Sequence, residues 1–305
     1  MKILIAGASG MLGTDLANQL KSHFAIVGVG RAAHSNAPIA YVMRDLAIPK
    51  MALDVVEREK PDLIFHTAAM TDVDGCQNKR FQALQSNLEV TRNMVEAANR
   101  VRAMFVFFST DYVFDGTKQG EYEEADPPNP LSVYGESKYL AERYIQQRAN
   151  RFVIFRTSWL FGYYGKSFPR AVLERAAASK SLEVVADQIG RPTYTVDLAQ
   201  ALADLLMKDE KAFERVNREI IHIANEGTTT WADYAVFLLK EAHQEDVKVL
   251  PITTSQSKRL APRPANSVLS LHKMRSVLGT QLRPWQDAVR DFLAELETKG
   301  RQPVG

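Results

Sequence analysis

The stretch that decides the fold is KILIAGASGMLGTDLANQL, residues 2–20. Its apolar run, residues 2–6, predicts a buried strand, and the pattern from Met11 onward predicts a helix. Three glycines follow the strand with the spacing Gly-x-x-Gly-x-x-Gly. Gly7 and Gly10 lie between the strand and the helix, and Gly13 lies in the first turn of the helix. In a strand–turn–helix unit, such glycines permit a tight turn, close approach of a pyrophosphate and close helix packing. The stretch therefore predicts a dinucleotide site; the alternative is a βα turn without a ligand.

Further apolar runs repeat this alternation along the first half of the chain. We expect strands over residues 25–29, 41–46, 62–66, 104–108 and 152–155, and helices over 49–60, 81–102 and 131–142. Alternating strands and helices favour a parallel sheet covered on both faces. The expected fold is therefore α/β, a Rossmann-like doubly wound parallel sheet. The pattern is less regular after Gly162, which predicts a dinucleotide-binding domain over 1–160 and a smaller α/β substrate-binding domain over 161–305, with some later segments returning to the first.

The end of the second expected strand bears on the choice of cofactor. Gly30-Arg31 stands where NAD-binding sites usually place an Asp or Glu, and no carboxylate follows until Asp45. An arginine at this point can hold a 2′-phosphate, so NADPH is favoured over NADH. The alternative is that Arg31 is a solvated loop residue. We expect the cofactor to contact Gly7, Ser9, Gly10, Met11, Leu12, Arg31, Asp45, Leu46, Ala68, Ala69, Tyr134 and Lys138.

The fifth expected strand delivers polar side chains at its carboxyl end, where ligands bind in open α/β sheets. Ser109-Thr110-Asp111-Tyr112 follows the apolar run directly. Further on, Tyr134 and Lys138 are four residues apart, so a helix places them on one face. A neighbouring ammonium favours the phenolate and should lower the tyrosine pKa toward the working pH, as acid–base catalysis requires. The alternative is an exposed pair on a helix.

Composition narrows the functional class. Net charge is +2, from 38 basic and 36 acidic residues, and no basic tract interleaved with aromatics points to nucleic acid. The single Cys76 excludes an internal disulfide and is typical of a reducing cytosol. The chain contains no run of 18 consecutive apolar residues, so no membrane span is predicted, and we expect a cytoplasmic protein. A homodimer is expected from the symmetry habits of soluble enzymes.

Several segments together resemble a known family. They are residues 109–116 (STDYVFDG), 129–138 (NPLSVYGESK), 156–162 (RTSWLFG), 187–193 (DQIGRPT) and 263–267 (RPANS). With the glycine turn, they resemble the extended short-chain dehydrogenases/reductases, and among these the dTDP-4-dehydrorhamnose reductases. The resemblance spans nearly the whole chain and is denser in its first 200 residues.

The resemblance implies reduction of the C4 ketone of dTDP-4-dehydro-L-rhamnose, a nucleotide-diphosphate sugar, by NADPH. Thr110 would hydrogen-bond the carbonyl oxygen, Tyr134 would protonate it, and Lys138 would lower the tyrosine pKa and bind the nicotinamide ribose. These three are the expected catalytic residues. The residues expected to contact substrate are Thr71, Val73, Asp111, Tyr112 and Trp159.

Other activities stay open at this point. Nucleotide-sugar 4,6-dehydratases carry a glutamate where this chain has Tyr112, a poor base at neutral pH, so elimination is disfavoured. An epimerase would keep the same Thr, Tyr and Lys. The regulatory subunit of methionine adenosyltransferase resembles the same family and acts by binding a partner. Met11, where many members have Gln, and His66, where Asn is common, depart from the family pattern.

A few polar residues lie outside these motifs. His66 is interpreted as a packed histidine, Asn87 as a polar prop for the site, and Asp72 with Asp74 as a solvated turn, so no metal is expected. Basic side chains near predicted loops are candidates for holding the substrate diphosphate, because Arg offers a planar fork for phosphate oxygens. These are Lys166, Arg170, Arg191, Arg259 and Arg263.

Overall fold

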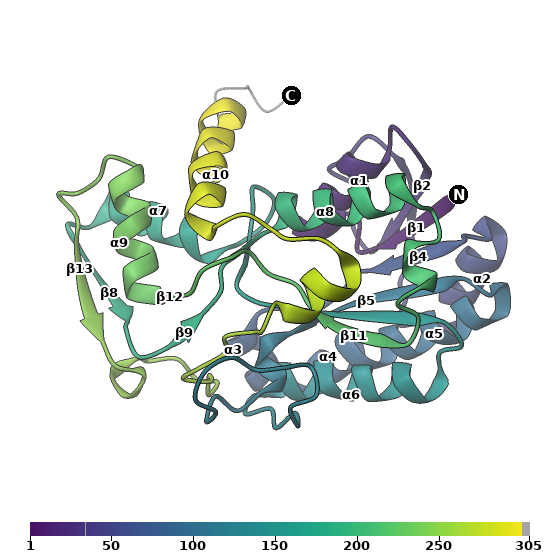
Figure 1. Ribbon diagram of the computed structural model, residues 1–305, viewed down its shortest axis with the longest axis horizontal. Helices are drawn as coiled ribbons and strands as arrows, with labels where there is room; N and C mark the ends of the chain where they lie inside the picture. The colour runs from purple at the N-terminus through teal and green to yellow at the C-terminus, as the bar shows by residue number, and fades with distance from the viewer. Residues whose placement is uncertain (34, 301–305) are drawn as a thin grey trace.

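The computed structural model describes residues 1–33 and 35–300, and a seven-stranded sheet organises them (Figure 1). The strands are β1 (Lys2–Ala6), β2 (Ala25–Gly30), β3 (Ala40–Met43), β4 (Leu63–His66), β5 (Met104–Thr110), β6 (Phe152–Thr157) and β11 (Glu219–His222). Their order is β11-β6-β5-β4-β1-β2-β3, and every neighbouring pair is parallel. This doubly wound arrangement confirms the Rossmann-like α/β prediction, with the strand order reversing beside β1.

Helices cover both faces of the sheet because alternate strand residues point to opposite sides. Ile3 and Ile5 belong to one apolar cluster, whereas Leu4 and Ala6 belong to the other. One face is covered by α1 (Met11–Leu20) and α8 (Thr195–Lys208). The other is covered by α2 (Pro49–Glu59), α5 (Val90–Val101) and α6 (Val133–Arg148), of which α5 and α6 lie below the sheet in Figure 1.

The helix expected over 81–102 is interrupted. After α3 (Val73–Asn78), the chain forms α4 (Arg80–Leu84), a π-helical turn (Gln85–Glu89) and then α5. The π turn contains Asn87, a buried residue whose amide bonds to residues outside the helix. Such turns are frequent at functional sites. The third strand also ends earlier than expected, at Met43, so Asp45 and Leu46 lie in the turn before α2.

The second part of the chain is built from shorter elements. They are β7 (Leu160–Phe161), α7 (Phe168–Ala178), β8 (Ser181–Val185), β9 (Ile189–Gly190), β10 (Thr193–Tyr194), β12 (Thr229–Thr230), α9 (Trp231–Glu241), β13 (Lys248–Ile252) and α10 (Trp285–Gly300), with short helical turns at Ala212–Glu214, Thr254–Gln256 and Met274–Leu278. A further short turn, Asp111–Val113, follows β5 in the first part. Three two-stranded pairings, β10-β7, β12-β9 and β13-β8, join them. An aromatic-rich cluster around Phe161, Tyr234 and Phe292 forms their core.

Segments after residue 160 also contribute to the first part. Strand β11 extends the large sheet, and Leu198 and Leu202 of α8 pack in the same cluster as Ile3. Met274 joins that cluster from the C-terminal third of the chain. The exact division into two domains at residue 160 stays a prediction.

Over the described ranges, 1–33 and 35–300, none of the helices combines the length and apolar character that a membrane crossing needs.

Candidate active site

Two cavities lie along the carboxyl edge of the large sheet. The smaller one, about 300 Å³, is here called the glycine-turn cavity; its lining includes Gly7, Ser9, Gly10, Gly30, Arg31, Arg44, Asp45, Leu46, Ala68 and Ala69. The larger one, about 980 Å³, is here called the large cavity; its lining includes Met11, Leu12, Thr71, Val73, Thr110, Asp111, Tyr112, Tyr134, Lys138 and Trp159. The two share Gly10, Thr67 and Ala69, so every residue expected to be catalytic or to contact the cofactor or the sugar lines one of two adjoining cavities.

The glycine turn is shaped so that backbone lies close to the cavity. Gly7 has φ +88°, and a Cβ there would lie 2.6 Å from the backbone nitrogen of Ala68. The Thr67 hydroxyl donates to the Ala6 carbonyl at 2.9 Å and so ties the β4 end to the β1 end. Helix α1 begins at Met11 and presents its N-terminus, where free N–H groups favour an anion.

The far end of the glycine-turn cavity contains two arginines. Arg31 follows β2, and the backbone N–H of Arg44 donates to the Gly30 carbonyl at 2.8 Å, which places Arg44 beside it. Asp45 accepts from the Ala47 N–H at 3.0 Å and stabilises the turn into α2. Arg44 was not among the residues expected to contact the cofactor; the signal for it in the sequence is a second arginine, within the third expected strand.

The large cavity brings together the hydroxyl, phenol and ammonium expected to be catalytic. Thr110 ends β5, and Tyr134 and Lys138 lie one turn apart on α6. The Ser132 hydroxyl caps this helix by accepting from the Gly135 N–H at 3.2 Å. Because the helix begins beside the β5 end, side chains from its first two turns reach the same space as Thr110.

The ionisation of this group differs from the expectation. Burial raises the pKa of Tyr134, and the Thr110 hydroxyl only partly opposes that shift, so the expected lowering by Lys138 is wrong for this structure. Lys138 is 3% exposed, with its ammonium 3.9 Å from the centre of the Phe107 ring. Burial lowers the pKa of Lys138 to about 7, and the Glu142 carboxylate opposes that shift. The phenol is therefore held protonated near neutral pH, the form in which it can donate a proton.

A buried carboxyl group orients the threonine. The Thr110 hydroxyl donates to Asp111 at 3.0 Å and accepts from the Tyr112 N–H at 3.2 Å. Burial raises the pKa of Asp111 to about 7, with hydrogen bonds from Ser267 and Thr110 opposing. The Tyr112 ring meets the Tyr134 ring edge-on, with centroids 6.0 Å apart. These contacts fix Thr110 and Tyr134 at one wall of the large cavity.

An aromatic pair, Trp159 and Trp231, also lines the large cavity. Trp159 adopts φ +46°, an unusual backbone conformation for a bulky residue, and its ring stacks on Trp231 at 3.4 Å between centroids with 8° between planes. A side chain at Gly190 would collide with the Trp159 indole. Trp231 was not among the residues expected at the site, because nothing near it in the chain points to Trp159.

The expected diphosphate-binding side chains separate into two groups. Lys166, Arg259 and Arg263 line the large cavity. Arg170 donates instead to the Tyr163 carbonyl at 2.7 Å. Arg191 donates to the Leu269 carbonyl at 2.8 Å and pairs with Glu121, so it holds loops together.

The interpretation of Asp74 as part of a solvated turn is wrong. Asp74 accepts from Arg263 at 3.1 and 3.2 Å, from Arg259 at 3.2 Å and from the Ala261 N–H at 3.0 Å. Partial burial would raise the pKa of Asp74, but these bonds outweigh it and lower the pKa to about 2. Asp72 caps α3 by accepting from the Gly75 N–H at 3.0 Å. The two carboxylates therefore serve different partners.

Two neighbouring polar residues behave as expected. His66 is buried, with Nε2 3.0 Å from the Thr91 hydroxyl. The Asn87 amide donates to the Ser137 hydroxyl at 2.8 Å and accepts from the Met70 N–H at 2.7 Å, so it ties the π turn to α6.

Among the residues that the structure describes, no three His, Cys, Asp or Glu side chains are grouped as a metal site would require.

Known proteins share this architecture over its whole length. A family model described as RmlD substrate binding domain matches residues 1–298. A dTDP-4-dehydrorhamnose reductase of Aggregatibacter actinomycetemcomitans is 36% identical over 97% of this chain and 99% of its own. A crystal structure of a dTDP-4-dehydrorhamnose reductase from Clostridium acetobutylicum superposes with TM-score 0.85 and 31% identity, covering 97% of this chain and all of the other. One from Bacillus anthracis in complex with NADP gives 0.84 and 30%, covering 96% and 99%. This chain belongs to the RmlD substrate binding domain family.

Proposed function

We propose that this protein reduces the C4 ketone of dTDP-4-dehydro-L-rhamnose with NADPH, giving dTDP-L-rhamnose. The observation that carries the proposal is the convergence of Thr110, Tyr134 and Lys138 in one cavity that adjoins the glycine turn. Relatives named as dTDP-4-dehydrorhamnose reductases, matched end to end, support the same activity. An epimerase would use the same triad, but no feature of the described residues favours it over the reductase.

The glycine-turn cavity fits a dinucleotide. The close approach of Gly7 to Ala68 leaves no room for a Cβ, and the N-terminus of α1 faces the pyrophosphate position. At the adenosine end, Arg31 and Arg44 offer two guanidinium groups for a 2′-phosphate. We therefore propose NADPH as the cofactor; the Bacillus anthracis relative was solved with NADP.

When bound, NADPH supplies the hydride for the ketone carbon. Tyr134 transfers its phenolic proton to the carbonyl oxygen, so that hydride and proton together convert C=O into CH–OH. As negative charge develops on that oxygen, the Thr110 hydroxyl would turn its single proton from Asp111, which accepts it in the described structure, to the oxygen and donate a hydrogen bond there. Lys138 binds the nicotinamide ribose, and its ammonium stabilises the phenolate that forms when Tyr134 gives up its proton.

The large cavity provides groups suited to a nucleotide-diphosphate sugar. Lys166, Arg259 and Arg263 line it, and Asp74 pairs with both arginines, so one carboxylate stands against the three positive charges of this set; the remaining charge suits the diphosphate. The proposed sugar contacts come from Thr71 and Val73 at the start of α3, from Asp111 and Tyr112 after β5, and from Trp159 after β6. A homodimer and a cytoplasmic location remain proposals; light scattering and cell fractionation test them.

The test is NADPH oxidation by the purified protein with dTDP-4-dehydro-L-rhamnose, followed by the fall in NADPH absorbance and by identification of the product. Wild type should form dTDP-L-rhamnose with one NADPH consumed per product. Tight NADPH binding without turnover of this sugar or of other 4-keto nucleotide sugars would instead support a binding module. Interconversion of C4 epimers without net NADPH consumption would support an epimerase.

A further inference from the structure

Helix α6 carries a third ionisable side chain on the face that packs against the sheet. Tyr134, Lys138 and Glu142 are spaced four residues apart, so they stack one turn above another. Lys138 is 3% exposed and Glu142 is 1% exposed. Burying a carboxylate this completely is costly unless it is paired and hydrogen-bonded. Glu142 therefore requires a partner inside the protein.

Arg156 of β6 is that partner. Its Nε donates to one Glu142 oxygen at 3.0 Å and its Nη2 to the other at 2.7 Å, a bidentate pair. Arg156 is 2% exposed. In the sheet it lies opposite Ser109, and the next residue lies opposite Thr110. The pair therefore fastens α6 to the sheet one residue from the end of β5, where Thr110 enters the large cavity.

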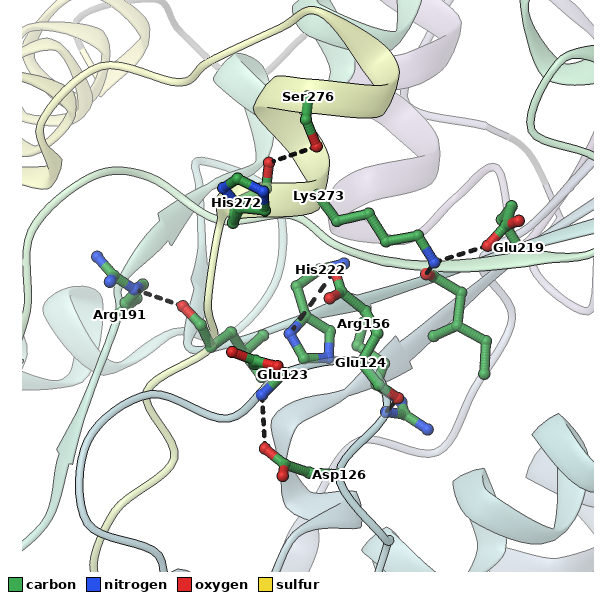
Figure 2. Close-up of polar contacts among 12 residues, drawn as sticks. Glu123, Glu124, Asp126, Arg156, Arg191, Glu219, His222, His272, Lys273 and Ser276 are labelled. Carbon is green, nitrogen blue, oxygen red and sulfur yellow. Dashed lines mark hydrogen bonds and ion pairs between the residues drawn. The ribbon is translucent and has the colours of Figure 1, made fainter.

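Other contacts hold Arg156 in place. Its Nη1 donates to the Glu124 carbonyl at 3.4 Å, and its guanidinium lies over the Phe114 ring at 5.1 Å. The Glu124 carboxylate in turn accepts from the backbone N–H of His222 on β11 at 2.8 Å. Figure 2 shows Glu124 lying between Arg156 and the His222 side chain. Because strand, loop and ring all fix the guanidinium, it offers Glu142 a rigid anchor.

Glu142 also balances the charge on Lys138. Two charged or titratable groups interact with Lys138 directly, Glu142 one turn along its own helix and His66 on β4. Tyr134 lies one turn before it, Asp111 acts on Tyr134, and Arg156 on β6 pairs with Glu142. Burial and the neighbouring Lys138 lower the pKa of His66 to about 3, so this histidine is neutral. Burial disfavours the Lys138 ammonium, and Glu142 is the carboxylate that counteracts it.

We propose that Glu142, anchored by Arg156, is a positioning residue that keeps Lys138 protonated and holds α6 in register with β5. It touches neither substrate nor cofactor and acts through Lys138. This inference rests on the proposed function only in assigning Lys138 to cofactor binding.

The test is the pH dependence of NADPH affinity, measured by fluorescence titration of the intact protein from pH 6 to 9. Above the pH at which Lys138 loses its proton, affinity for the anionic cofactor should decline. Glu142→Gln keeps the size and removes the charge, so this alkaline limb should move about one pH unit lower, as expected when an opposite charge is lost. Lys138→Met should abolish the limb.

Glu136→Gln is the matched control. Glu136 lies on the same helix and has its own bidentate arginine partner, Arg80, at 2.6 and 2.7 Å, but this pair is solvent-accessible. For Glu136→Gln, the decline of NADPH affinity at alkaline pH should coincide with that of wild type. If Glu142→Gln does not fold, the double variant Glu142→Gln/Arg156→Met leaves no lone buried charge and should show a smaller shift in the same direction, because the positive charge of Arg156 is lost together with the negative charge of Glu142.

The outcomes separate this inference from the proposed function. The inference would be overturned if a folded Glu142 variant lost NADPH affinity at the same pH as wild type, or if the alkaline decline of affinity survived in Lys138→Met. Neither result would contradict NADPH binding. Failure of the wild-type protein to bind NADPH would contradict the proposed function itself. A purely structural role for Glu142 would lower the melting temperature without moving the limb.

Discussion

The Thr110 hydroxyl donates to the buried Asp111 carboxyl group at 3.0 Å. Burial raises the pKa of Asp111 from 3.8 to about 7, so the folded protein retains a proton that the unfolded chain releases near pH 4. Stability should therefore decrease as pH rises from about 4 to 7 and level off above 7. Asp111→Asn should remove this contribution, which is of order a few kcal/mol. Urea unfolding at pH 5 and pH 8 checks it: an equal pH response in both proteins would contradict the prediction.

Tyr134→Phe should lower kcat about 10²- to 10⁴-fold, the usual contribution of a positioned proton donor. NADPH affinity should stay within about twofold, because only the acidic hydroxyl is lost. Steady-state kinetics and fluorescence titration measure the two quantities. Tyr139→Phe is the control, because Tyr139 lies on the same helix. Among the described residues, its hydroxyl accepts a hydrogen bond only from Arg143, at 3.3 Å, so activity should be unchanged.

Arg31→Ala and Arg44→Ala should each weaken NADPH binding about 10- to 100-fold, since a charge-assisted hydrogen bond contributes roughly 1.5–3 kcal/mol. NADH lacks the 2′-phosphate, so its affinity should change little. Calorimetric titration with both cofactors measures the ratio. Arg58→Ala, which removes an arginine paired with Glu59 on α2, serves as the control. Equal loss of NADPH and NADH affinity would show that these arginines do not recognise the 2′-phosphate.

Trp231→Ala should raise KM for the nucleotide sugar about tenfold while NADPH affinity stays constant. The stacked ring supports Trp159 at φ +46°, and its loss removes roughly 0.5–1.5 kcal/mol of stacking besides buried area. Val236→Ala is the control on the same helix, because Val236 is 53% exposed. If KM does not change although melting curves show a folded protein, Trp159 does not depend on Trp231 for its position.

Gly7→Ala should destabilise the protein by about 1–3 kcal/mol and abolish NADPH binding, because φ is +88° and the new Cβ would lie 2.6 Å from Ala68. Gly120→Ala has a similar φ, +82°, but nothing within 4 Å among the described residues. It should cost about 1–2 kcal/mol and leave NADPH binding intact. Thermal unfolding and NADPH titration of both variants separate the cost of the positive φ, which both share, from the effect of the short distance between the new Cβ and Ala68, which only Gly7→Ala has. Retained NADPH binding in Gly7→Ala would contradict a cofactor at this turn.

Local patterns in the chain predicted most of the sheet and the order of its elements. The run 2–6 and the glycines after it correspond to β1 and the turn before α1, and the four-residue spacing does place Tyr134 and Lys138 one turn apart. The expected helix 81–102 was wrong at Gln85–Glu89. Its apolar periodicity is that of an ordinary helix, whereas the π turn accompanies hydrogen bonds from Asn87 to Met70 and Ser137, distant in sequence.

By itself, the sequence determined the alternation of strands and helices, the close backbone turn at Gly7 and the facing of Tyr134 and Lys138, because backbone preferences and side-chain periodicity act over a few residues. Only the tertiary structure decided that Asp74 pairs with Arg259 and Arg263, that Trp231 supports Trp159, and that burial raises the pKa of Tyr134. These contacts join segments far apart in the chain, and solvent exclusion depends on everything packed around a group. Neither the long-range contacts of a residue nor its exclusion from solvent can be read from its immediate neighbours in the sequence.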